Sequence, residues 1–260
     1  MAIVNQSLPV RPWQDRRLWR LPGMMPLPLP EWLLVDDAYA AQMAERARLL
    51  AACPDRVLHE LRPHRAADEL LETVRAALPA LGFVEDGAGI LRPDGGRITP
   101  DPQRPLWTLG HLLQADFCIL ERPPGAAEHV MTAAVLAFPA SWTLAEKIGR
   151  PLSGIHAPVE VYDATLARRV QRLFDALRPE QPLMRFNAMR YVDPALFQPR
   201  TEADPRAHPE GAGRYLRAER QVLRRLPATG AVVFSINTWV VALAQLGPAE
   251  LAGLDAPPLA

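Results

Sequence analysis

Cysteine is scarce in this sequence, which contains only Cys53 and Cys118, far apart in the chain. Two distant cysteines exclude a disulfide framework and the close spacings of zinc and iron-sulfur sites, and they favour a reducing, cytoplasmic location. Long apolar runs are also missing, because no run approaches the roughly 20 residues that span a bilayer. The N-terminal residues contain no apolar segment like that of a signal peptide. We therefore expect a soluble protein with no membrane partner.

The sequence has no excess charge of either sign, since 29 basic and 29 acidic residues give a formal net charge of zero. Without a global field, the protein has no electrostatic attraction for nucleic acid or for an acidic membrane surface. Several familiar motifs are absent too: there is no P-loop, no GxGxxG after a strand, no GxSxG elbow and no HExxH. These absences argue against nucleic-acid binding and weaken nucleotide-dependent, hydrolytic and zinc-protease functions.

The composition allows a substantial core, because 49% of the 260 residues are hydrophobic. Residues 1–34 form a proline-rich stretch in which successive prolines exclude regular helix. This stretch carries Trp13, Trp19 and Trp32, whereas disordered tails are poor in aromatic residues. We therefore predict an N-terminal arm, residues 1–34, that packs on a single domain formed by residues 35–260.

Hydrophobic periodicity and turn residues predict a mixture of helices and strands. Helices are expected at 36–50, 66–81, 162–177 and 214–226. Strands are expected at 117–121, 130–138, 183–192 and 231–243, with a further hairpin around 89–98. The elements do not alternate as regular βαβ units, and the first two strands are close enough to form a hairpin. An α+β fold with a mainly antiparallel sheet follows, and a mixed α/β sheet is the alternative.

The stretch 136–162 combines a strand end, a short helix and a loop that fixes one histidine. Ser141 is a suitable N-cap for the short helix, and Gly149 ends it, so His156 lies in a constrained, proline-rich loop. An imidazole held in this way can ligate a metal or act in catalysis, and a hydrogen-bonded structural histidine is the alternative. His111, in another predicted helix, is the second candidate.

Charged side chains near the C-terminal strand form a second group of interest. Three arginines share one face of the predicted helix 214–226: Arg217, Arg220 and Arg224. Guanidinium groups in a row can pair bidentately with carboxylates, and a solvated helix face is the alternative. Glu146 and Lys147 are neighbours near a helix end, where a salt pair adds little stability.

The order of three sequence blocks is more specific than any single motif. The blocks are QADFCIL at 114–120, SWTLAEKIGRPLSGIHAPVEVY at 141–162 and LRAERQVLRRLPATGAVVFSINTWV at 216–240. In this order they resemble the haem-dependent oxidative N-demethylase family, over residues 25–243. The resemblance implies a PAS-like antiparallel sheet that carries b-type haem. It also implies a monooxygenase that uses O2 to release formaldehyde from a small methylated amine, with electrons from a flavin and iron-sulfur reductase or a ferredoxin-type donor.

The resemblance also assigns roles to individual residues. His156 lies in IHAP at 155–158, which matches the IHxP motif of the family, so it is expected to ligate the haem iron. The arginines that match those of the family are expected to anchor haem propionates or tune the pocket: Arg217, Arg224 and Arg225. Asp116 and Glu146 are the candidates for a carboxylate that holds a substrate ammonium near the iron.

Several positions depart from the family pattern. Glu160 stands where a proline is expected, Ala188 replaces a tryptophan after Arg185 and Asn187, and Asn237 stands where the last strand often has arginine or lysine. Altered pocket walls would change the choice of substrate before they removed the role of haem. The alternatives to the enzyme are a PAS-type sensor that binds haem or another small ligand without turnover, and a structural relative that has lost the cofactor. Formaldehyde release separates the enzyme from the sensor, and the lack of a haem spectrum identifies the third case.

Overall fold

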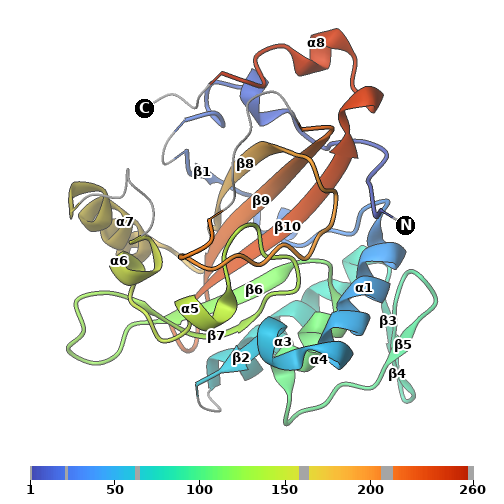
Figure 1. The fold of residues 1–260 in the computed structure, drawn as a ribbon. Helices are drawn as coiled ribbons and strands as arrows, with labels where there is room; N and C mark the ends of the chain where they lie inside the picture. The colour runs from blue at the N-terminus through green and yellow to red at the C-terminus, as the bar shows by residue number, and fades with distance from the viewer. Residues whose placement is uncertain (1, 21–22, 62–64, 158–163, 206–212, 257–260) are drawn as a thin grey trace.

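The computed structural model describes residues 2–20, 23–61, 65–157, 164–205 and 213–256. Its main element is a seven-stranded antiparallel sheet with the strand order β1-β8-β9-β10-β6-β7-β2 (Figure 1). A separate three-stranded sheet has the order β3-β4-β5. The predicted α+β class with a mainly antiparallel sheet is therefore confirmed over the alternative of a mixed sheet.

The elements of both sheets and the helices around them have the following bounds. The large sheet contains β1 (Met25–Pro26), β2 (Leu58–Glu60), β6 (Asp116–Glu121), β7 (Val130–Val135), β8 (Leu183–Tyr191), β9 (Tyr215–Arg225) and β10 (Val232–Ala242). The small sheet contains β3 (Val84–Asp86), β4 (Gly89–Leu91) and β5 (Arg97–Ile98). The α-helices are α1 (Tyr39–Ala52), α2 (Pro54–Val57), α3 (Arg65–Ala77), α4 (Pro105–Leu112), α5 (Leu144–Lys147), α6 (Leu152–Ile155), α7 (Ala164–Ala176) and α8 (Pro248–Leu251). The 3-10 turns are η1 (Pro12–Gln14), η2 (Leu29–Glu31), η3 (Leu78–Leu81) and η4 (Leu243–Gln245).

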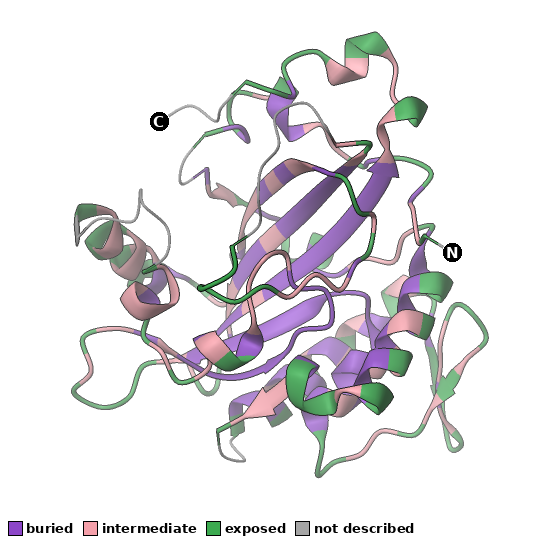
Figure 2. Cartoon of the chain, viewed as in Figure 1, coloured by how far each residue is buried: buried purple, intermediate pink, exposed green. Residues whose placement is uncertain are grey.

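The prediction of a helix at 214–226 is wrong, because this stretch forms β9. Its arginines recur at spacings that mimic a helix face, but β9 lies between β8 and β10 and pairs with both along its length. A central strand is covered on both faces, so it lacks the alternation of apolar and polar residues that marks a half-exposed strand. Most of β9 is buried although it is rich in arginine (Figure 2). Charge therefore did not indicate exposure here.

Each face of the large sheet packs against its own set of helices. The helices α1, α3 and α4 contribute Met43, Leu70 and Leu109 to a cluster with Val222 and Val233 of the sheet. The helices α5, α6 and α7 cover part of the opposite face, where a second apolar cluster forms (Figure 1). The alternation of side chains along a strand decides which cluster each residue joins.

The tryptophans of the N-terminal segment are buried, and each indole N–H has an acceptor. Trp13 donates to the Glu250 carbonyl at 2.9 Å, and Trp19 donates to the Ala256 carbonyl at 2.7 Å. Trp32, only 1% exposed, donates to the Ser235 hydroxyl of β10 at 3.0 Å. The segment before β1 therefore packs on the sheet and on the C-terminal residues through specific contacts. The division into residues 1–34 and 35–260 stays a prediction.

Several element ends differ from the predicted ones. The short helix α5 begins after Thr143, and Ser141 is not its N-cap but a left-handed residue with φ 64°. The helix predicted at 66–81 continues as η3 after Ala77, since Pro79 cannot donate a helical hydrogen bond. The predicted start of the helix 162–177 lies outside the described residues, and α7 is described from Ala164. No helix in the described ranges has the length and apolar character needed to cross a membrane.

Candidate functional site

The segment that carries His156 is hydrogen-bonded to β7. Gly149 donates to the Met131 carbonyl at 2.8 Å, Met131 donates to the Arg150 carbonyl at 3.1 Å, and Leu152 donates to the His129 carbonyl at 3.0 Å. Gly149 has φ 77°, a left-handed conformation that favours glycine. The start of β7 thus pairs with residues 149–152, while its end pairs with β2. The position of the short helix α6 is therefore set by the sheet.

His156 follows α6 directly and is fixed by several hydrogen bonds. Its Nδ1 lies 2.8 Å from the Leu152 carbonyl oxygen, which also accepts the His156 backbone N–H at 3.2 Å. Lys147 holds the preceding residue, because its Nζ donates to the Ile155 carbonyl at 2.7 Å. A ring nitrogen that faces a carbonyl must carry the proton, so Nε2 is assigned as the basic nitrogen of the ring.

The surroundings of His156 favour its neutral form. Burial lowers the pKa of His156, and the positive charges of Lys147 and Arg185 lower it further, while the hydrogen bond to Leu152 opposes them. The imidazole is therefore neutral at pH 7, which is the form that binds a metal ion. A ligating histidine commonly donates its other ring N–H to a backbone carbonyl, as His156 does.

Arg185 is a residue of this region that sequence reasoning did not select. It lies in β8 opposite Gln221 of β9, and its charge is close enough to lower the pKa of His156. Its guanidinium has no hydrogen-bond or ion-pair partner within the described part of the chain. Burial lowers the pKa of Arg185, and the charge of Glu219 partly opposes this effect. The available signal in the sequence was the Arg-x-Asn pattern at 185–187, which places two polar side chains on one face of a strand.

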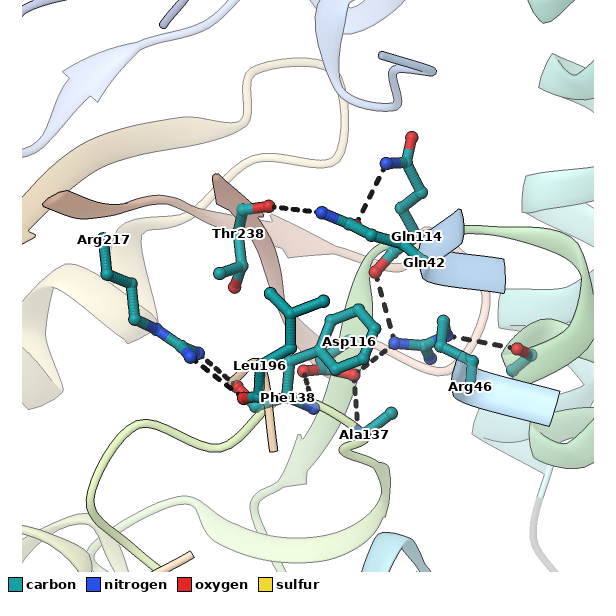
Figure 3. Close-up of polar contacts among 10 residues, drawn as sticks. Gln42, Arg46, Gln114, Asp116, Ala137, Phe138, Leu196, Arg217 and Thr238 are labelled. Carbon is teal, nitrogen blue, oxygen red and sulfur yellow. Dashed lines mark hydrogen bonds and ion pairs between the residues drawn. The ribbon is translucent and has the colours of Figure 1, made fainter. Parts of the chain in front are cut away.

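The predicted arginines of β9 do not gather around His156. Arg217, only 2% exposed, donates to the carbonyls of Phe138 at 2.6 Å and Leu196 at 2.9 Å (Figure 3). Arg225 lies eight residues further along β9, roughly 26 Å away at the usual rise of a strand. Its guanidinium donates to the carbonyls of Phe174 and Leu177 at the C-terminal end of α7. It also donates to the carbonyl of Gly230 in the turn between β9 and β10. These two arginines support backbone segments at opposite ends of the strand.

Arg220 and Arg224 point to the other face of β9, since residues of even and odd number alternate in a strand. Arg220 donates to the carbonyls of Glu31 and Trp32 at 2.9 and 2.7 Å. Arg224 stacks on Trp32, with its guanidinium carbon 4.2 Å from the centre of the indole ring, and burial lowers its pKa. The single row of arginines expected on a helix is thus divided between two faces of a sheet.

The two predicted carboxylates lie in different environments. Asp116 is fully buried and accepts hydrogen bonds from Arg46 at 2.6 Å and from the backbone N–H groups of Ala137 at 2.7 Å and Phe138 at 3.0 Å (Figure 3). Its oxygens are therefore engaged in joining α1 to the segment after β7. Arg46 donates as well to the carbonyl oxygens of Gly110 and Gln114.

Glu146 is only partly buried, and it does not pair with Lys147 as predicted. It accepts hydrogen bonds from the Thr143 hydroxyl at 2.6 Å and from the Glu202 backbone N–H at 3.0 Å. Lys147 instead pairs with the Glu202 carboxylate at 2.8 Å. Adjacent residues of a helix do not face each other, which explains why the expected pair does not form.

His111, the second histidine candidate, lies on the other side of the sheet. It belongs to α4, and its ring lies 4.0 Å from that of Trp107, centre to centre. Its Nδ1 is 2.9 Å from the Trp107 carbonyl oxygen, and burial lowers its pKa. Since α4 packs with α1 and α3, His111 and His156 belong to different faces.

A polar groove of about 600 Å³ lies between α7 and the ends of β6, β9 and β10. It is lined by Glu121, Arg122, His129, Asp175, Arg225, Thr229, Gly230 and Ala231. Arg122 and Asp175 pair across it at 3.0 Å, so opposite charges in the groove already neutralise each other. Among the described residues, no three histidine, cysteine or acidic side chains gather in a way that could hold a metal ion. A metal bound by His156 therefore needs further ligands that these side chains do not supply.

A comparison with protein families indicates which kind of cofactor to expect. The model of the haem-dependent oxidative N-demethylase, alpha subunit-like family matches residues 23–253. The chain belongs to this family. The name of the family implies haem as the cofactor. The residues present are chemically suited to this group, because the neutral, oriented imidazole of His156 could hold the iron and the guanidinium of Arg185 could hold a carboxylate of the porphyrin.

Proposed function

We propose that this chain is a haem-dependent oxidative N-demethylase, a monooxygenase that releases formaldehyde from a small methylated amine. The family match over residues 23–253 supports the class of reaction. The observation that carries the haem site is the neutral imidazole of His156, whose Nδ1 is bonded to the Leu152 carbonyl in the manner typical of a ligating histidine. When bound, haem supplies the chemistry by which O2 oxidises an N-methyl carbon.

We also propose that the central part of the sheet is PAS-like. Five neighbouring strands, β7-β6-β10-β9-β8, have the order 2-1-5-4-3 when renumbered along the chain. The helices α5, α6 and α7 lie between the second and third of these strands in sequence. A PAS sheet has the same order and also carries helices in this connection, where it binds its ligand. This agreement supports a ligand site on the face that α6 and His156 cover.

The chain's own residues have distinct tasks in this proposal. His156 would hold the haem iron, while Leu152 fixes the ring and Lys147 holds the backbone beside it. Glu146 is better placed than Asp116 to hold a substrate ammonium, because Asp116 is fully buried whereas Glu146 is only partly buried. The role of propionate anchor for the β9 arginines stays a prediction: Arg217, Arg224 and Arg225.

The family describes an alpha subunit, so we propose that this chain works with other subunits. A flavin and iron-sulfur reductase, or a ferredoxin-type donor, would supply the electrons that the reaction of a monooxygenase needs. A cytoplasmic location suits such a partnership, and the two cysteines of the chain are both free thiols. The choice of amine depends on the pocket walls on the His156 face. The departures at Ala188 and Asn237 do not alter these walls, because both residues lie on the other face of the sheet, opposite Ala218 and Arg220 of β9.

An optical spectrum tests the haem site first. Protein from haem-supplemented cells is expected to show a near-stoichiometric Soret band that shifts or disappears in His156→Ala. His111→Ala is the matched control, because it removes a buried imidazole of lowered pKa from the other face. A normal band in His156→Ala, with a changed band in His111→Ala, would move the ligand to His111. The absence of any band in folded wild-type protein would contradict the haem site.

Turnover is tested with the haem-loaded protein, a reductase and dimethylamine. Formaldehyde release that depends on O2 and on His156 is the expected result. A stable Soret band without formaldehyde from any small methylated amine would instead favour the PAS-type sensor. Thus the two experiments separate the enzyme, the sensor and a relative without cofactor.

A further inference from the structure

Arg185 is a partly buried cation without a hydrogen-bond or ion-pair partner in the described part of the chain. No hydrogen bond, ion pair or ring contact joins its guanidinium to the described residues, and its nitrogens keep some exposure to solvent. Burying a charge without a partner costs free energy, which is why burial lowers the pKa of Arg185. A partly buried guanidinium without an acceptor is typical of a site where an anionic ligand supplies the missing acceptor.

Glu219, whose charge acts on Arg185, is already engaged. The Glu219 carboxylate accepts hydrogen bonds from Arg217 Nε at 3.1 Å and from Gln221 Nε2 at 3.1 Å, one on each oxygen. The other buried arginines of the sheet also have partners, which are the carbonyls bound by Arg217, Arg220 and Arg225 and the indole under Arg224. Arg185 differs from them in that its donors can be reached by a ligand, whereas the Nε atoms of Arg220 and Arg224, which also lack a partner among the described residues, are closed off by burial.

Arg185 and His156 lie on the same face of the sheet. Leu183, two residues before Arg185 in β8, packs in one apolar cluster with Leu152 and Ile155 of α6. Alternate residues of a strand share a face, so Arg185 points to the side that α6 covers. Asn187 is the next residue of β8 on this face, and its amide also has no partner among the described residues. Together they present a guanidinium and an amide beside the imidazole.

We propose that Arg185 binds a carboxylate of the ligand that lies against His156. The planar fork of a guanidinium matches a carboxylate through two parallel hydrogen bonds, and Asn187 offers a further donor. Two sources supply this chemistry: a propionate of the porphyrin, or the carboxylate of an N-methylated amino acid that serves as the amine substrate. The inference rests on the proposed haem site and deepens it, since the second source specifies the substrate class.

The first test measures the affinity of the haem-free protein for haem and for haem dimethyl ester, whose propionates carry no charge. If Arg185 holds a propionate, esterification weakens binding to the wild type by about 10- to 100-fold. Arg185→Gln then binds both forms with equal affinity, and Arg185→Lys, which keeps the charge but not the fork, lies between them. Arg75→Gln is the matched control, because Arg75 pairs with Glu85 on the surface of α3.

The second test measures the Soret shift of the haem-loaded protein with N,N-dimethylglycine and with dimethylamine. If Arg185 holds the carboxylate of a substrate, Arg185→Gln weakens the binding of dimethylglycine by about 10- to 100-fold and leaves that of dimethylamine unchanged. In this case haem and its dimethyl ester bind the wild type and the variant alike. The two sources thus give opposite patterns.

The variant is expected to fold, because it removes an unpaired charge, so its urea midpoint should equal or exceed that of the wild type. Unchanged affinity of Arg185→Gln for haem, its ester and dimethylglycine would overturn the proposal. If the wild type binds no haem, the proposed function fails, and titration of dimethylglycine into haem-free protein still decides the carboxylate site. Binding that depends on Arg185 would retain the site, and no binding would overturn it.

Discussion

Arg46 and Arg185 are two buried or partly buried arginines in contrasting surroundings. Arg46 is fully buried in α1, pairs with Asp116 and donates to the carbonyls of Gly110 and Gln114. Arg185 has no such partners within the described residues. The contrast separates two uses of the same side chain. A guanidinium whose acceptors belong to the protein joins elements of the fold, whereas one whose donors stay open is available to a ligand.

The largest effect is expected when the paired arginine loses its partner. Asp116→Ala leaves Arg46 as an uncompensated buried charge and removes the acceptor of the Ala137 and Phe138 N–H groups. The free energy of unfolding should fall by about 3–5 kcal/mol. Urea denaturation measures it, with Asp204→Ala as the control, because Asp204 is exposed and pairs with Arg200. A loss below about 1 kcal/mol, as expected for the exposed pair, would break the comparison.

A smaller effect is expected from Lys147, which links the His156 segment to the loop that carries Glu202. Lys147→Met keeps much of the side-chain volume but removes the donor to the Ile155 carbonyl, so stability should fall by about 1–3 kcal/mol. The Soret maximum should also shift, because the imidazole loses the backbone support beside it. Arg150→Gln, which removes the other ion pair of Glu202 and leaves the donor to the Ile155 carbonyl in place, provides the control. If Lys147→Met changes stability alone, Lys147 supports the fold without positioning His156.

The smallest effect concerns pH and His129, a buried histidine without a part in the proposed site. Burial lowers the pKa of His129, with the charges of Arg225 and Arg122 acting in the same direction and Gln171 and Asp175 opposing. The unfolded chain therefore takes up a proton more readily than the folded one, and the stabilisation is lost as pH falls below the ordinary histidine pKa. This contribution changes by at most about 1.4 kcal/mol per pH unit.

Unfolding of the haem-free protein between pH 5 and 7 measures this contribution. Stability should rise with pH in the wild type, and His129→Gln should reduce the slope. His111 acts in the same direction, since burial lowers its pKa too, so a residual slope is expected in the variant. An identical slope in the wild type and in His129→Gln would show that His129 is protonated equally in both states.

Local patterns predicted those parts of the fold whose sequence matches their environment. The hairpin of β6 and β7 and the strand β10 are rich in apolar and β-branched residues, and the structure has them where they were expected. The strand β9 was misjudged because its arginines find carbonyl acceptors on distant segments, such as Phe138 and Leu196 for Arg217. Acceptors of this kind have no signature in the local sequence.

The candidate site shows the same limit. The loop around His156 was identifiable because glycine and proline restrict the backbone locally. Arg185 was not, because a side chain that lacks a partner is defined by everything around it. The Arg-x-Asn pattern at 185–187 places two donors on one face of a strand, but only the assembled sheet reveals that nearby Glu219 is already engaged.

The pairing of β9 with β10 has a consequence for how this family can vary. Eleven residue pairs join the two strands without a bulge, from Tyr215 with Ala242 to Arg225 with Val232. Whether a residue of β9 meets the helices of one face or the other therefore depends only on whether its number is odd or even. Inserting one residue at the start of β9 would put Leu216 in the place of Arg217 and Leu223 in the place of Arg224. Every later side chain of the strand would then point to the wrong layer. Divergence along this strand is thus confined to substitutions, while changes in length must fall in the loops at its ends.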